Sequence, residues 1–253
     1  MTSLLLQKSA RAVMLALGLA TALAGLPPAP AMAADMNKVL RVVFSAGEEG
    51  FDPAAAHDLY SGTVGQMIFE TLLTNDYIAR PAKLATLTAE ALPQVTDNGQ
   101  TYTFRLRKGI HFTPDPAFKG VKRELVADDY VYSLKRLMDP KLRSPWTWLL
   151  DGKIVGLDEL AAEAKKTGSF DYALSVPGLE AVDRYTLRIR LKQPDYNLAY
   201  VLAHEPTGAV AREVVAAYAD AGGRVMSNPV GTAVYIGVCT FPGGVTGTAA
   251  SGW

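Results

Sequence analysis

The sequence contains one cysteine, Cys239, and three histidines among 253 residues. One cysteine excludes an internal disulfide, and the scattered positions of His57, His111 and His204 lack the spacing of metal ligands. Neither sign of charge is in excess, because 25 acidic residues balance 25 basic ones. This balance gives no field that would attract nucleic acid or an anionic membrane. We therefore expect no metal, cofactor or nucleic acid among the ligands.

The first residues have the layout of a secretory signal peptide. Lys8 and Arg11 precede a charge-free apolar run at residues 12–26, and the small-residue site Ala31-Met32-Ala33 follows a proline-rich stretch. The run is short for a transmembrane anchor, which needs about 20 residues. No cysteine stands at the site to accept a lipid. We expect residues 1–33 to be removed on export, leaving a soluble periplasmic protein.

Two segments, residues 101–107 and 185–191, alternate strictly between apolar and polar side chains. Such alternation predicts strands with one buried and one exposed face, as in an antiparallel sheet. The arginines in both segments are interpreted as the solvated face rather than as an anion site. A more continuous apolar run predicts a first strand at residues 38–44. The buried face should hold the apolar side chains Tyr102, Phe104, Leu106, Leu187, Ile189 and Leu191.

Four segments have the apolar spacing of helices: residues 61–73, 128–138, 157–166 and 211–218. In the second of them, Asp128 and Asp129 stand at the N-terminus, where the helix dipole favours negative charge. We interpret the pair as capping in preference to acid–base chemistry. The uncharged, glycine-rich residues after Tyr235 predict an irregular tail.

Five motifs together, in family order, resemble the family 5 extracellular solute-binding proteins, which serve importers of peptides, nickel and related solutes. The motifs are FDPA at residues 51–54, IFETLL at 68–73, LPQVTDNGQTYTFRLRKGIHF at 92–112, ADDYVYSLKR at 127–136 and NPVGT at 228–232. One departure is Val126, where the family has a threonine that caps the following helix. Asp128 is expected to substitute for the missing cap oxygen.

The resemblance implies an α/β fold: lobe I of a type II-like periplasmic binding protein, with an inserted α+β subdomain. Lobe I would comprise residues 34–81 and 205–235, the inserted subdomain residues 82–204, and the irregular tail residues 236–253. Relatives enclose solute between lobe I and a second lobe that closes by a hinge motion. The uncharged tail stands where the family has a basic, aromatic strand, so we expect the second lobe to be missing here. We expect an incomplete copy, as a frameshift or a damaged gene end would give, whose family partner is the importer permease in the membrane.

The resemblance also implies ligand contacts in two local stretches. One is the loop after the FDPA motif, and the other is Ser144-Pro145-Trp146, where oligopeptide binders have an aromatic residue. An aromatic face on a loop suits a cleft that buries a solute. Core packing is the alternative for Trp146 and more strongly for Trp148, and a plain surface position is the alternative for His57. The candidate ligand-binding residues are His57, Asp58, Leu59, Tyr60 and Trp146.

Two other functions compete with solute binding. A secreted hydrolase would need a nucleophile or metal motif, and the sequence has no Gly-x-Ser-x-Gly elbow, His-Glu-x-x-His pair or phosphate loop. Cys239 lies in the predicted irregular tail, and His111 lies in a strand-like segment that favours a structural role. The second alternative is a structural fragment that binds no small ligand. It predicts the same fold without ligand-induced stabilisation.

Overall fold

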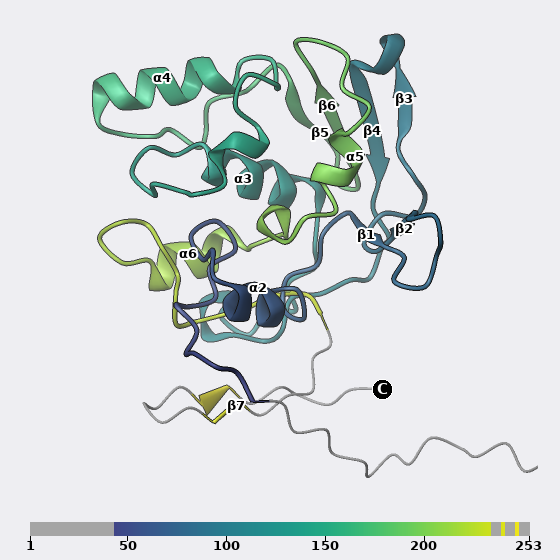
Figure 1. The fold of residues 1–253 in the computed structure, drawn as a ribbon. Helices are drawn as coiled ribbons and strands as arrows, with labels where there is room; N and C mark the ends of the chain where they lie inside the picture. Colours follow the sequence, from purple (N-terminus) through teal and green to yellow (C-terminus); the bar gives the residue numbers. More distant parts are fainter. Residues whose placement is uncertain (1–42, 234–238, 241–245, 248–253) are drawn as a thin grey trace, which may run out of the picture. The chain divides into compact units, whose positions relative to one another are not determined.

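The structure is a computed structural model that describes residues 43–233, 239–240 and 246–247 (Figure 1). Its α-helices are α2 (Leu59–Gly65), α3 (Ala127–Leu137), α4 (Leu157–Thr167), α5 (Leu198–Val201) and α6 (Arg212–Tyr218). Its strands are β1 (Leu73–Asn75), β2 (Leu84–Thr86), β3 (Gln94–Thr96), β4 (Thr101–Arg105), β5 (Leu179–Asp183), β6 (Thr186–Arg190), β7 (Cys239–Thr240) and β8 (Thr246–Gly247). Single 3₁₀ turns lie at Asp97–Gly99, Pro116–Phe118, Thr147–Leu149 and Glu205–Thr207.

A four-stranded antiparallel sheet in the order β3-β4-β6-β5 confirms the strand prediction. The two alternating segments pair directly, with Phe104 opposite Leu187 and Tyr102 opposite Ile189. All six side chains predicted for the buried face are buried. The arginines lie on the opposite face, where Arg188 and Arg190 both pair with Glu180. One apolar face is therefore available for packing against helices.

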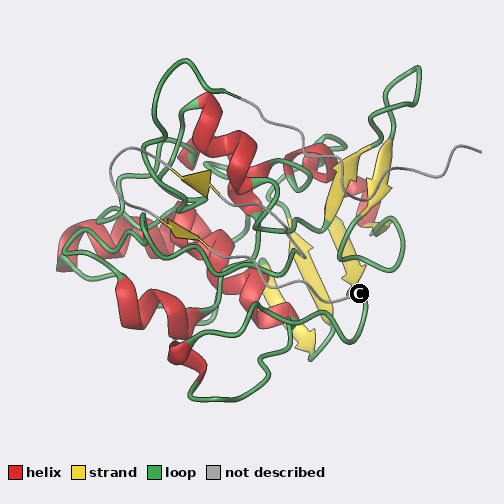
Figure 2. Cartoon of the chain, turned by 90° about the horizontal axis from the view of Figure 1, so that it is seen from below, coloured by secondary structure: helices red, strands yellow, loops and turns green. Residues whose placement is uncertain are grey.

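Helix α3 covers this apolar face, packing against β5 and β6; in Figure 2 the longer strands lie on the right and most of the helices on the left. Its buried stripe includes Tyr130, Leu134 and Leu137, and it ends before Asp139-Pro140 as predicted. The cap prediction was half wrong. Asp128 does not supply the missing cap oxygen; instead Asp129 Oδ2 accepts the Val126 amide at 2.9 Å, the reciprocal bond of a capping box, and no side chain replaces the threonine oxygen. Asp128 remains exposed.

The helix predicted at residues 61–73 is wrong in extent. Helix α2 begins earlier, at Leu59, and ends at Gly65, and the chain then passes through turns into β1 at Leu73. Leu72 and Leu73 are buried in the main core, so their apolar character reflects a buried turn and strand rather than a helical stripe. The helices predicted at 157–166 and 211–218 are confirmed as α4 and α6.

Several predictions fall on the ends of the chain. The signal peptide at residues 1–33 and most of the strand at 38–44 lie outside the described residues. Within the segment predicted as an irregular tail, β7 and β8 pair antiparallel over two residues each. Among the described residues, no helix combines the length and the apolar character that a membrane crossing requires.

Candidate functional site

The structure brings the two predicted ligand-contact stretches together. The indole Nε1 of Trp146 donates a hydrogen bond to the carbonyl oxygen of Ala56 at 2.7 Å. Ala56 directly precedes the loop of residues 57–60, so the turn at 144–148 and this loop are neighbours although 90 residues apart in sequence. The chain that leads into the first turn of α2 and the segment after α3 are therefore neighbours.

Asp58 shapes this loop. Its Oδ1 accepts the amides of Tyr60 and Ser61, both at 2.9 Å, and its Oδ2 accepts the amide of Glu49 at 3.2 Å. Burial acts to raise the pKa of Asp58, but the hydrogen bonds from Ser61, Glu49 and Tyr60 outweigh it and leave the pKa below its ordinary value. Asp58 is therefore the N-cap of α2, and most of its acceptor capacity is used by the chain itself.

The side chains of His57, Leu59 and Tyr60 differ in their exposure and in their contacts. Leu59 is 75% exposed and is the most open apolar group of the loop. His57 Nδ1 lies 3.0 Å from Glu49 Oε2, and both side chains are largely exposed. Tyr60 stacks on Phe44 with ring centroids 4.7 Å apart. Leu59 and His57 are the loop groups most available to a ligand.

Trp146 has features of both roles that the sequence left open, core packing and ligand contact. Its ring is partly buried against the main core, as a packing residue would be. It also lies 5.2 Å from the ring of His204 and 6.5 Å from that of Trp148. Trp148 is 61% exposed and extends the aromatic surface outward. The pattern Trp-x-Trp was the available signal for Trp148, whereas no sequence spacing pointed to His204.

A third segment, the turn after α5, completes the region. Glu205 Oε2 accepts a hydrogen bond from Gln66 Nε2 at 2.6 Å, which links this turn to α2. Glycine at position 62 leaves room for this carboxylate, since a Cβ there would displace the end of the Glu205 side chain. With His204 beside Trp146, three distant segments meet. We call this region the aromatic face and define it by its side chains: His57, Leu59, Tyr60, Trp146, Trp148 and His204.

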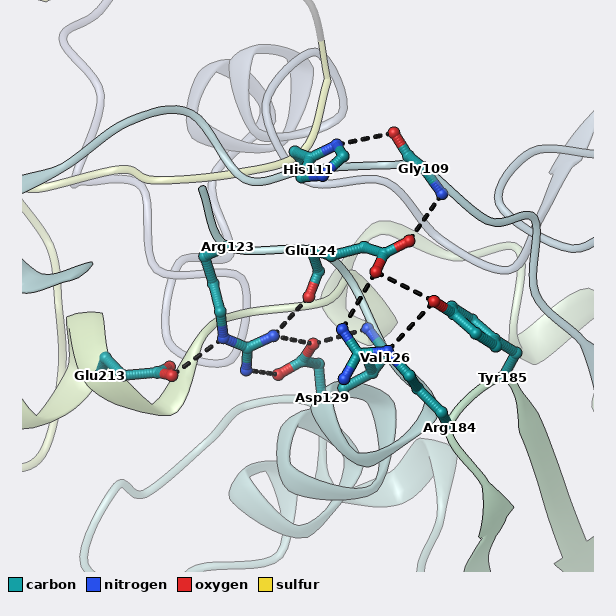
Figure 3. Close-up of polar contacts among 9 residues, drawn as sticks. All are labelled: Gly109, His111, Arg123, Glu124, Val126, Asp129, Arg184, Tyr185 and Glu213. Atoms are coloured by element: carbon teal, nitrogen blue, oxygen red, sulfur yellow. Dashed lines mark hydrogen bonds and ion pairs between the residues drawn. The ribbon is translucent and has the colours of Figure 1, made fainter. Parts of the chain in front are cut away.

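A charged cluster lies beyond the N-terminus of α3 (Figure 3). Arg123 donates to both carboxylate oxygens of Asp129 and to Glu213. The Gly109 amide, Arg184 and the Tyr185 hydroxyl all donate to Glu124 and hold its pKa at about 2. These groups satisfy one another and join α6, α3 and the β5–β6 turn. We interpret the cluster as structural.

The aromatic face presents apolar groups with polar groups at its edge. Exposed leucine and tryptophan groups offer apolar contact, while His57, Glu49 and Glu205 offer polar contacts at its edge. Within residues 43–233 no imidazole hydrogen-bonds a serine, threonine or cysteine side chain, the arrangement that activates a nucleophile. The described residues contain no group of three potential metal ligands.

Comparisons with known proteins place the chain beside proteins of one family. The family model described as "Bacterial extracellular solute-binding proteins, family 5 Middle" matches residues 83–240. The chain is 27% identical over 175 residues to the periplasmic oligopeptide-binding protein OppA of Escherichia coli (strain K12), covering 68% of this chain and 28% of the relative. It is 28% identical over 225 residues to the glutathione-binding protein GsiB of Shigella flexneri, covering 89% and 36% respectively.

The fold is that of the peptide-binding proteins, a mixed α/β fold. The crystal structure of Haemophilus influenzae OppA in complex with RPPGFSPFR matches with a TM-score of 0.59 and 25% identity, covering 75% of this chain and 34% of that one. The chain thus spans between 28% and 36% of the length of these relatives.

Proposed function

The chain belongs to family 5 of the bacterial extracellular solute-binding proteins, and on that premise we propose that it carries the solute-binding function of an ABC importer for peptides or related solutes. Two relatives are named for oligopeptide and glutathione binding, which supports a peptide-like solute. The family is one of binding proteins, and we propose no catalytic step. Export through the signal peptide at residues 1–33 and docking to a membrane permease are parts of the same proposal.

We further propose that the aromatic face is the solute-binding surface, contributed by lobe I at residues 34–81 and 205–235 and by the inserted subdomain at 82–204. The observation that carries this proposal is the hydrogen bond from Trp146 to Ala56, which unites the two stretches chosen from the sequence. A solute laid on this face would meet Leu59 and the indoles, whose faces bind apolar and cationic groups. His57 and Glu49 at the edge would orient it through hydrogen bonds.

Affinity should be low for the 253 residues alone. A cleft protein encloses its ligand from two sides and excludes water, and each tenfold change in affinity corresponds to about 1.4 kcal/mol. The chain spans about a third of its relatives' length, so the face supplies one side of such a cleft. Exposed apolar groups on an uncovered face also favour self-association.

Calorimetry of the purified chain against di-, tri- and oligopeptides tests the proposal. Weak heats, at dissociation constants above the micromolar range, are expected, and Trp146→Ala should abolish them. Val121→Ala is the matched control, because Val121 is 65% exposed and contributes no side chain to the aromatic face. Equal binding by both variants, or no binding even at high peptide concentration, would reject the aromatic face as the site.

A further inference from the structure

A buried ion pair lies behind the loop that carries the candidate site. Asp52 Oδ1 and Oδ2 accept hydrogen bonds from Nη1 and Nη2 of Arg136 at 2.9 and 2.7 Å. The side chains are 0% and 2% exposed. This bidentate geometry is the one in which a planar guanidinium binds a carboxylate most strongly. Asp52 belongs to the FDPA motif and Arg136 to α3, so the pair joins two motifs that lie far apart in sequence.

Further bonds tie a third segment to the pair. The carboxylate of Asp52 also accepts the amides of Ala54 at 3.1 Å and Val225 at 2.8 Å. Arg136 Nη2 donates to the carbonyl oxygen of Gly223 at 2.9 Å. The carboxylate of Asp52 therefore accepts four hydrogen bonds, and the FDPA segment, α3 and residues 223–225 meet at one point. A buried hydrogen-bonded network of this kind makes its surroundings rigid.

A short path leads from the pair to the aromatic face. The carbonyl oxygen of Asp52 accepts the amides of Ala55 and Ala56 at 3.0 and 2.9 Å, which forms a tight turn. The carbonyl oxygen of Ala56, at the end of that turn, accepts the Trp146 indole. The position of the indole is thus fixed through the turn that Asp52 opens, and the next residue along the chain is His57.

Stability alone is a weak reason for burying such a pair. Removing two charges from water is costly, and well-packed apolar residues often stabilise a fold equally well. Apolar residues would not impose a bidentate geometry or accept the Val225 and Ala54 amides. The ion pair therefore holds the loop in one position, which an apolar contact would not do.

We propose that Asp52 and Arg136 are positioning residues of the aromatic face: by fixing the turn of residues 52–56 against α3, they set the place of Trp146 and of the loop that follows. As a statement about ligand binding, this inference rests on the proposed function. As a statement about Trp146, it rests on the hydrogen bonds alone. The two can therefore fail separately.

Fluorescence of Trp146 provides the test. In a Trp148→Phe, Trp253→Phe background Trp146 is the sole indole, because the sequence contains three tryptophans. Arg136→Lys keeps the charge but loses the two-point contact, and Asp52→Asn keeps the shape but loses the charge. Leu187→Ala is the control, because it removes buried core volume from β6 without touching the pair. All variants are measured under conditions where circular dichroism shows them folded.

The expected result is increased acrylamide quenching and a red-shifted emission of Trp146 in Arg136→Lys and Asp52→Asn, with neither change in Leu187→Ala. Either positioning variant that folds gives the answer. Unchanged quenching in a folded variant, or an equal change in Leu187→Ala, would overturn the inference. If Trp146 responds as expected but no peptide binds the parent chain, the positioning role stands and the proposed solute-binding function fails.

Discussion

Gly231 lies where two segments cross, and replacing it with alanine should be strongly destabilising. A Cβ at position 231 would stand 1.8 Å from the carbonyl oxygen of Ile68 and 2.5 Å from its carbon, both of which are backbone atoms. The Gly231 carbonyl oxygen also accepts the Thr113 amide at 2.9 Å. Alanine must push the two segments apart, and neither neighbour can rotate out of the way as a side chain could.

The expected cost combines two effects. Overpacking costs about 1–3 kcal/mol, and weakening of the bonds to Thr113 adds about 0.5–1.5 kcal/mol for each bond lost. With the amide and hydroxyl bonds of Thr113 both lost, Gly231→Ala should lower the free energy of unfolding by about 2–6 kcal/mol, a large part of the roughly 5–15 kcal/mol of a typical domain. Urea denaturation followed by circular dichroism measures this.

Gly65→Ala is the matched control. Gly65 is the last residue of α2, and a Cβ there meets nothing within 4 Å. The helical backbone should gain about 0.5–1 kcal/mol from the substitution. We expect Gly231→Ala to lower the free energy of unfolding and Gly65→Ala to raise it. If Gly231→Ala unfolds at the same urea concentration as the parent chain, the crossing at Ile68 is not as close as described and the argument fails.

Three further predictions concern the sheet, Glu124 and the N-terminus. Phe104→Ala removes a fully buried ring and should cost about 3–5 kcal/mol, whereas Val95→Ala, at a 41% exposed edge position, should cost far less; equal urea midpoints would contradict the sheet packing. Glu124 has its pKa lowered from 4.5 to about 2, so it stabilises the fold above pH 4.5 and loses this effect as pH falls to about 2. The free energy of unfolding of Glu124→Gln should lie below that of the parent chain at neutral pH and become equal to it at acid pH. The control Glu163→Gln, an exposed helix substitution, should have the same pH dependence as the parent chain. N-terminal sequencing of exported protein should begin at or next to Ala34, and a product retaining residues 4–26 would contradict export with cleavage.

The sequence predicted the sheet well because alternation reports burial directly. Tyr102, Phe104, Leu187 and Ile189 alternate with polar residues, and a half-buried antiparallel strand is the structure that uses such a pattern. The helix at residues 61–73 failed for a related reason. Leu72 and Leu73 are apolar because a turn and a short strand bury them, and apolar spacing alone does not distinguish that from a helical stripe.

The candidate site was only partly predictable. The resemblance supplied His57 to Tyr60 and Trp146, but no local pattern shows that Trp146 bonds Ala56 or that His204 lies beside it, because both are contacts between distant segments. The sequence allowed two roles for Asp58, because an aspartate that precedes a helix is commonly its N-cap and need not contact a ligand. The roles of these residues toward a solute stay predictions.

Nuclear magnetic resonance of the labelled chain, titrated with tripeptides to high concentration, tests the central claim most directly. The aromatic face includes the Trp146 indole N–H, which donates to Ala56 in the free protein. A weakly binding peptide should shift that indole signal and the amides of residues 57–60, and leave the exposed edge strand β3 and helix α4 unchanged. Peptide-dependent shifts confined to other residues, or none at saturating peptide, would contradict the claim that this face binds the solute.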